Sequence, residues 1–223
     1  MAEGLPPITA EKIVAAALEL TRAHGLDNWS IRQLSGALDV WPGVIYHHIG
    51  DRDAVVAEVT DAVVAAMPVP DRDLPWRQWF TELLVDGRAV MRQHPGVARR
   101  MCLVGPTVPA ALPAIDTGVH ILERAGFGAD AAPVYRYLFD SAFLLVASED
   151  DRAATPAARY DPHDVLAAYE DSTDHPGLAS AARYARYTRE RAAGGRTAED
   201  AAAAFHAFTV ARALDGAEAL LPR

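Results

Sequence analysis

Residues 30–53, SIRQLSGALDVWPGVIYHHIGDRD, carry the local signals that decide the fold. Ser30 and Gln33 have the spacing of a capping box, in which each side chain satisfies a backbone N–H at a helix start. The short helix predicted after Ser30 ends near Asp39, a residue type that tolerates the left-handed conformation of a tight turn. Pro42 suits the first turn of a second short helix, because its missing N–H would be unpaired there anyway. Two short helices joined by such a turn form a helix-turn-helix pattern.

Further helices are predicted on both sides of this stretch. Thr9 and Asp51 are expected to cap helices over 9–24 and 51–67. Three prolines between residues 68 and 75 then interrupt the helical pattern. We therefore predict two domains, residues 1–67 and residues 68–223. The later helices are expected at 76–94, 97–103, 108–125, 130–148, 163–169, 178–191 and 197–221.

Composition points to an all-α protein. Half of the 223 residues are apolar and alanine is abundant, while few segments alternate in the manner of strands. The chain has no run of 18 uncharged apolar residues and no secretory pattern at its start, which argues against a membrane protein. The single cysteine, Cys102, cannot form an internal disulfide and fits a reducing compartment. We therefore expect a cytoplasmic protein.

The charge is unfavourable for contact with nucleic acid. The formal net charge is −9, and within residues 1–66 four basic residues stand against nine acidic residues. Nonspecific attraction to phosphates should therefore be weak, and recognition would depend on a few well-placed groups in each of two subunits.

The residue pattern is nevertheless specific. A first apolar helix, the capping box, and the short helix that ends in Tyr-x-His and an apolar residue before a charged cap together resemble the DNA-binding domain of the tetracycline-repressor (TetR) family. The matching residues are Ile13, Ala16, Ala17, Leu20, Gly25-Leu26, Ser30-Ile31-Arg32, Leu34, Leu38, Val40, Ile45-Tyr46-His47-His48-Ile49 and Asp51-Arg52-Asp53. Later matches are His94-Pro95, Gly105-Pro106, Leu122, Gly126-Phe127, Leu214-Asp215-Gly216 and Leu220-Leu221.

The resemblance implies a set of DNA-contacting residues. Pro42, Gly43 and Val44 would face the bases, and His47 would face the groove wall. The other expected contacts are Tyr46, His48 and Arg52 to phosphates, Arg32 to a base or phosphate, and Ser30 beside them. Two residues depart from the family pattern: Trp41 replaces a polar helix cap, and Asp39 replaces a turn glycine. The resulting apolar surface suits contact with thymine methyl groups rather than bidentate recognition of guanine.

The resemblance also implies a homodimer and an effector site. The four-helix interface would use residues 130–149 and 197–221 of both subunits, and the apolar character of these segments supports it independently. Met101 stands where tetracycline-binding members carry a histidine for drug-bound magnesium, so we predict no metal or cofactor. We expect a largely apolar effector between the 76–94, 97–125 and 130–149 helices. The candidate ligand residues are Trp79, Met101, His120, Tyr135, Phe139 and Glu149, although Trp79 also suits a core and His120 an ordinary polar position.

These features predict a one-component transcriptional regulator. We expect a repressor that binds palindromic operator DNA as a homodimer and is released by a small, largely apolar ligand. The alternative is a protein of the same fold that sequesters a small molecule without binding DNA. We do not expect an enzyme, because hydrolase and metalloprotease motifs are missing from the sequence. A glycine pattern at 126–131 follows a predicted helix rather than a strand, which argues against a dinucleotide site.

Overall fold

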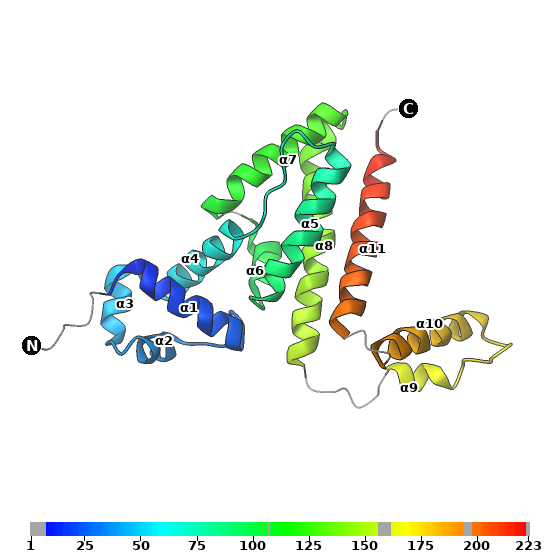
Figure 1. Cartoon of the computed structure of the whole chain (residues 1–223), viewed down its shortest axis with the longest axis horizontal. Coiled ribbons are helices and arrows are strands. Elements are labelled where there is room, and N and C mark those ends of the chain that lie inside the picture. Colours follow the sequence, from blue (N-terminus) through cyan, green and yellow to red (C-terminus); the bar gives the residue numbers. More distant parts are fainter. Residues whose placement is uncertain (1–7, 107, 156–161, 194–197, 222–223) are drawn as a thin grey trace, which may run out of the picture.

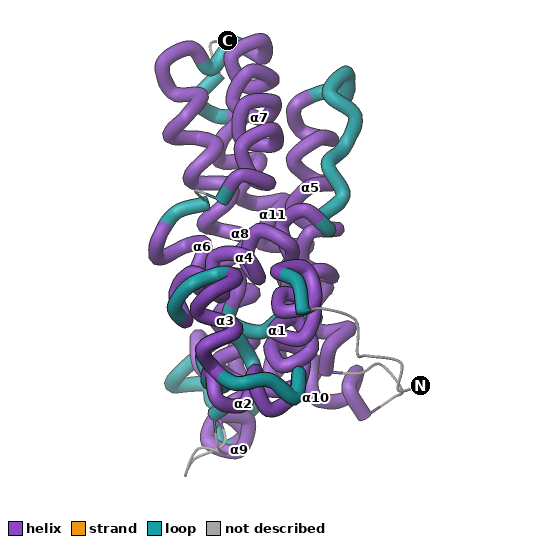
Figure 2. Tube along the Cα trace, turned by 90° about the vertical axis from the view of Figure 1, so that its left-hand side faces the viewer, coloured by secondary structure: helices purple, strands orange, loops and turns teal. Residues whose placement is uncertain are grey.

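The computed structural model describes residues 8–106, 108–155, 162–193 and 198–221. Within these residues the chain is all helical, as predicted (Figure 1, Figure 2). The elements in chain order are α1 (Ala10–His24), α2 (Ile31–Ala37), α3 (Pro42–His48), α4 (Arg52–Ala65), α5 (Trp76–Arg92), α6 (Val97–Val104), η1 (Pro109–Ala111), α7 (Leu112–Ala125), η2 (Gly128–Asp130), α8 (Ala131–Ala154), α9 (Pro162–Ala167), α10 (Pro176–Ala193) and α11 (Ala198–Glu218).

We call α1, α2 and α3 with their turns the reading head. Its local signals are confirmed: Ser30 and Gln33 form a complete capping box, and Pro42 is at the first position of α3. Asp39 adopts the left-handed conformation with φ 53° and is the only non-glycine residue with positive φ among the described residues. The Asp51 carboxylate caps α4 by accepting from the Ala54 N–H at 2.9 Å. Short-range side-chain chemistry therefore sets the angle between α2 and α3.

The larger part of the molecule is built around α8. This helix packs against α5, α6, α7 and α11 and ends six residues later than predicted. A chain of aromatic contacts runs from α5 along α8, with Phe80 to Tyr135, Tyr135 to Phe139 and Phe139 to Phe143 at ring-centroid distances of 5.8, 6.4 and 4.7 Å. Packing on several sides explains why α8 is apolar nearly all round. In Figure 1, α11 runs antiparallel to α8 along one edge of the molecule, opposite the reading head.

Helices α9 and α10 form a hairpin that packs mainly on itself and touches the start of α11 (Figure 1). Both helices occur near their predicted positions. Thr197, which the sequence pattern suggests as the cap of the last helix, lies outside the described residues.

The reading head is joined to the larger part in two places. Helix α4 runs from the head into the larger part, where the Asp61 carboxylate accepts from the Ala110 N–H at 2.7 Å. The turn between α5 and α6 makes the second contact: the Pro95 carbonyl accepts from the Leu26 N–H at 2.8 Å, and His94 Nε2 accepts from Arg22 Nε at 3.1 Å.

No single helix among the described residues is long and apolar enough to cross a membrane. Val97–Val104 and Pro109–Ala125 satisfy the length and composition criteria only together, across a bend of 82°.

His206 of α11 is fully buried, and neither of its ring nitrogens has a hydrogen-bond partner among the described residues. Burial and, to a smaller extent, the positive charge of Arg88 lower the pKa of His206 to about 4, with a partial offset from the Ala142 backbone. The imidazole is therefore neutral in the folded protein at neutral pH.

We predict that His206→Leu makes unfolding less sensitive to acid. As pH falls from about 6.5 towards 4, the unfolded wild-type chain takes up a proton at this residue while the folded chain does not, so wild-type stability falls. The variant lacks this loss. The difference in free energy of unfolding between variant and wild type should therefore be about 2 kcal/mol more favourable to the variant at pH 5 than at pH 7.5. Urea unfolding at both pH values measures it. If variant and wild type differ in free energy of unfolding by the same amount at both pH values, His206 is not a neutral buried histidine.

Candidate functional site

The outer surface of the reading head carries most of the predicted DNA contacts. Ile45 is fully buried and holds α3 on the head, while Tyr46 is 54% exposed. Gly43, His47 and His48 are also exposed, and Pro42 and Val44 are half-buried. The two histidine rings meet edge to face at 5.4 Å. Helix α3 thus presents a small, largely apolar surface flanked by one phenol and two imidazoles.

Two predicted DNA contacts lie at the start of α2: its cap Ser30 and Arg32 in its first turn. Both are exposed. The Ser30 hydroxyl is committed to the capping box. An open groove of about 600 Å³ separates α2 from the start of α3, with Arg32 on one side and Trp41 and Pro42 on the other. The groove places the single exposed arginine of α2 next to α3.

Arg52 is placed differently from the expectation. Its Nε donates to the Trp29 carbonyl at 3.1 Å and its Nη2 to the Leu26 carbonyl at 2.8 Å, while the guanidinium stacks over the Trp29 ring. These contacts fasten the start of α4 to the loop between α1 and α2. We therefore assign Arg52 to holding the reading head together and withdraw it from the expected phosphate contacts.

An apolar cavity lies where α4 meets the larger part of the molecule. Three of the predicted ligand residues line it: Met101, Tyr135 and Phe139. The other lining residues are Val64, Met67, Val69, Leu83, Pro106, Ala110, Ala111, Ala114 and Phe143. Burial raises the pKa of Tyr135 well above its usual range, so the phenol stays neutral. The cavity volume is about 30 Å³, space for a water molecule but far below the several hundred Å³ of typical ligand pockets.

The other three predicted ligand residues do not line this cavity. Trp79 is fully buried and packs on Phe80, with its indole N–H donating to the Pro70 carbonyl at 3.2 Å, so it belongs to the core. His120 lies on the outer face of α7, where its side chain is 56% exposed. Glu149 is buried in an ion-pair cluster.

The sequence interpretation missed Val64 and Met67 because both fall in the helix assigned to the first domain. Their approach to α8 depends on the direction in which α4 leaves the reading head. Gly87 of α5 permits this approach, since a Cβ atom there would lie 2.5 Å from the Met67 methyl carbon.

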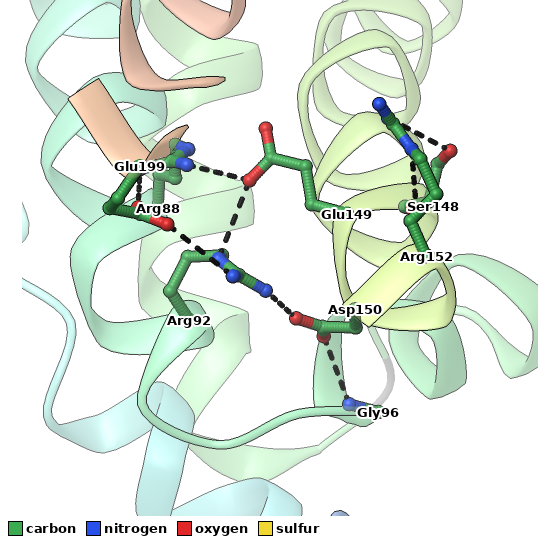
Figure 3. Close-up of polar contacts among 8 residues, drawn as sticks. All are labelled: Arg88, Arg92, Gly96, Ser148, Glu149, Asp150, Arg152 and Glu199. Carbon is green, nitrogen blue, oxygen red and sulfur yellow. Dashed lines mark hydrogen bonds and ion pairs between the residues drawn. The ribbon is translucent and has the colours of Figure 1, made fainter. Parts of the chain in front are cut away.

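Figure 3 shows the cluster that contains Glu149. Arg88 of α5 donates to Glu149 of α8 at 2.6 Å and pairs with Glu199 of α11 at 2.7 Å. Arg92 pairs with Asp150, whose second oxygen accepts from the Gly96 N–H at 3.0 Å. Burial raises the pKa of Asp150, although the Gly96 N–H and Arg92 oppose the shift. The cluster therefore ties α5, α8, α11 and the α5–α6 turn together, and Glu149 is not available to a ligand.

Helices α8 and α11 present exposed apolar side chains along one edge of the molecule. We call Tyr137, Leu144, Phe205 and Phe208 the α8–α11 face; their exposed fractions lie between 47% and 59%. A Cβ atom at Gly216 would lie 3.6 Å from the Tyr137 hydroxyl, so Tyr137 lies across α11 at that glycine. Phe205 and Phe208 stack at 6.4 Å and border a groove of about 430 Å³ between α10 and α11.

Comparison with known proteins decides the family. No protein-family model matches the chain. A helix-turn-helix transcriptional regulator of Saccharopolyspora erythraea is 30% identical over 160 residues, which cover 69% of this chain and 68% of that protein. The chain belongs to the TetR family of transcriptional regulators.

Two solved structures show the same fold. The Streptomyces coelicolor TetR family protein ActR, in complex with actinorhodin, has a TM-score of 0.69 at 24% identity, covering 95% of this chain and 99% of that one. BioQ with its double-stranded DNA operator has a TM-score of 0.60 at 21% identity, covering 66% of this chain and 89% of that one.

The described part of this TetR family chain contains no group of three or more His, Cys, Asp or Glu side chains arranged to hold a metal ion. Glu149, Asp150 and Glu199 form an acidic cluster, but each of these carboxylates is paired with Arg88 or Arg92.

We predict that Arg88→Met destabilises the protein by about 3 kcal/mol, because it leaves the buried Glu149 carboxylate without its principal partner. The control is Arg99→Met, which removes a pair with Asp151 at 3.7 Å whose side chains are 52% and 60% exposed, and should cost less than about 1 kcal/mol. Urea unfolding of both variants measures the difference. Equal losses would show that the cluster contributes no more than a surface pair.

Proposed function

We propose that this TetR family regulator is a repressor that binds palindromic operator DNA as a homodimer and leaves it when a small, largely apolar effector binds. The proposed division is a DNA-binding domain over residues 1–67 and an effector-binding and dimerisation domain over residues 68–223. The observation that carries the proposal is the exposed α3 surface, held by a complete capping box and the left-handed Asp39 turn in helix-turn-helix geometry. The DNA complex of the structurally similar BioQ supports the same use of the fold.

The effector is proposed to enter the cavity lined by Met101, Tyr135 and Phe139. Because the cavity volume is only about 30 Å³, a ligand must displace side chains to fit. Met67 and Met101 are suited to this, since methionine is unbranched and changes rotamer readily. The actinorhodin complex of the structurally similar ActR supports a small-molecule effector.

The cavity lining explains how the effector would act on DNA binding. Val64 is near the end of α4 and Met67 lies two residues beyond that end, so a ligand that displaces them would also displace α4. Helix α4 packs against α1, and Arg52 at its start holds the loop between α1 and α2. The reading head should therefore move with α4. The distance between the two reading heads of the dimer then depends on the position of α4. An effector that favours one position of α4 shifts the population towards one such distance, and this changes the affinity for the operator.

Homodimer formation is proposed to bury the α8–α11 face. Exposed aromatic and leucine side chains along two neighbouring antiparallel helices form the kind of surface that a second copy covers through a two-fold axis. Two copies of α8 and α11 would then make a four-helix bundle.

A small-molecule sequestering protein without DNA binding is the second candidate, and the acidic first 66 residues favour it. Selection of bound duplexes from a random pool with the full-length protein separates the two. A regulator should enrich an inverted repeat whose affinity falls when a true effector is added. Failure to retain any duplex at low salt would reject the regulator and favour the second candidate.

We predict that Tyr46→Phe weakens binding by a similar factor for all duplexes, because the proposed phosphate contact positions the head without reading sequence. Val44→Ala should instead relax preference at one thymine-containing step in each half-site. Competition binding with the selected duplex and single-base variants compares the two changes. A new base preference in Tyr46→Phe, or an unchanged one in Val44→Ala, would contradict these roles.

We predict that Phe208→Glu converts the protein to a monomer, because it removes an apolar ring and places a carboxylate in the apolar interface, a cost that pairing with the nearby Arg212 offsets only in part. The same change at Leu112, which is 57% exposed on α7, is the control and should leave the dimer intact. Sedimentation velocity over a range of concentrations measures the mass. A Phe208→Glu protein that remains dimeric would place the interface elsewhere.

A further inference from the structure

Trp41 is unusually exposed for a tryptophan. Its side chain is 84% exposed, whereas Trp29 and Trp79 are 3% and 0% exposed and Trp76 is partly buried. Among the described residues it has no aromatic, cation–π or hydrogen-bonding partner. An indole this exposed adds little to the core, and tryptophan is enriched at binding interfaces, so the ring is available to another molecule.

The position of Trp41 identifies that molecule. Trp41 directly precedes Pro42, the first residue of α3, and its extended backbone has φ −74° and ψ 144°. Its indole gives α3 no side-chain cap, so the residue does not stabilise the helix start. It lies with Arg32 on the groove between α2 and α3. In a helix-turn-helix the first helix crosses the DNA backbone and the second enters the major groove, so this groove would face the sugar–phosphate chain.

The charge of the reading head strengthens this assignment. Arg52 is committed to the Leu26 and Trp29 carbonyls, and Arg22 to Glu19 and His94. Arg32 is thus the one exposed arginine of the reading head whose guanidinium makes no ion pair or hydrogen bond within the described residues, and Asp39 borders the same groove. With so little positive charge, contacts that release no counterions must supply a large part of the affinity.

We propose that Trp41 is an additional DNA-contacting residue: its ring packs on a deoxyribose beside the recognition helix, and its indole N–H donates to the adjacent phosphate. This inference rests on the proposed DNA binding and extends it to a residue outside the motif match. Such a contact positions the head on any sequence. Because the indole is neutral, the contact adds affinity without adding to the salt dependence.

The test is fluorescence-anisotropy titration of the full-length protein with its selected duplex and with an unrelated duplex, at several salt concentrations. Trp41→Ser removes the ring and supplies a good helix cap, so the head should fold at least as well as in the wild type. We expect an affinity loss of about tenfold or more on both duplexes, with the salt slope unchanged. Trp41→Tyr, which keeps an aromatic ring and a donor, should recover part of the loss.

Two further variants serve as references. Arg32→Ala should lower the magnitude of the salt slope by about one for each head, as expected for loss of a phosphate contact. Leu112→Ser removes an apolar side chain that is 57% exposed on α7, far from α3 in sequence, and should bind both duplexes like the wild type.

Several results would overturn the inference. Wild-type affinity in Trp41→Ser would remove Trp41 from the interface while leaving the proposed function intact. A loss confined to the selected duplex would mean that Trp41 reads bases instead of the backbone. If the wild type retains no duplex at all, the proposed function and this inference both fail.

Acrylamide quenching of tryptophan fluorescence tests the contact directly, because Trp41 is the most exposed of the four tryptophans. Addition of either duplex should protect part of the tryptophan fluorescence from acrylamide, and this protected part should be missing in Trp41→Ser. Protection that appears with rising protein concentration and without DNA would show that the indole meets a second protein molecule, which contradicts the proposal.

Discussion

The ion-pair cluster around Arg88 and Arg92 is the interaction on which the arrangement of the larger domain depends. It joins side chains from α5, α8 and α11, which are distant in sequence, at one end of the bundle (Figure 3). Arg88 and Glu149 are 8% and 6% exposed, so their charges are costly unless they remain paired. This requirement fixes how far α11 can slide along α8, and therefore where Phe205 and Phe208 stand relative to Leu144.

The same cluster reaches the reading head through the backbone. Asp150 accepts from the Gly96 N–H, and Gly96 adopts φ +93° against Leu26, where a Cβ atom would lie 3.1 Å from the Leu26 Cβ. The Leu26 N–H in turn donates to the Pro95 carbonyl. The head is thus held by α4, which borders the cavity, and by a turn that is anchored to α8. Because the two attachments are separate, displacement of α4 alone would rotate the head about the turn instead of releasing it.

The sequence predicted those features whose cause is local. The capping box at Ser30, the left-handed Asp39 and the first-turn Pro42 each depend on residues within a few positions, so short-range chemistry decides them. Arg88 and Glu149 are 61 positions apart, and the fully buried His206 has no local signal that distinguishes it from a surface histidine. Their roles arise only when α5, α8 and α11 pack together.

The candidate ligand residues also differ in whether local sequence or long-range packing determines their position. Met101, Tyr135 and Phe139 were found because apolar side chains on the inner faces of helices tend to line any cavity between them. His120 lies outside the buried stripe of α7, which Gly118, Ile121 and Leu122 form in the folded protein. The structural role of Arg52 could not be predicted from the sequence, because its guanidinium is held by the backbone carbonyls of a loop more than 20 residues earlier.

Acidity and exposed apolar surface together explain how such a head would bind DNA. Residues 1–66 carry more than twice as many acidic as basic groups, so a single head gains little from counterion release. Contacts from uncharged side chains near α3 are short-ranged, so they form only when the head is correctly positioned on the DNA. In the proposed homodimer, a second head linked through the α8–α11 face would make the second DNA contact intramolecular and so multiply the affinity. If the proposed function is correct, operator binding would depend on dimer stability more closely than in a protein with a strongly basic head, whose long-range attraction can hold a monomer on DNA.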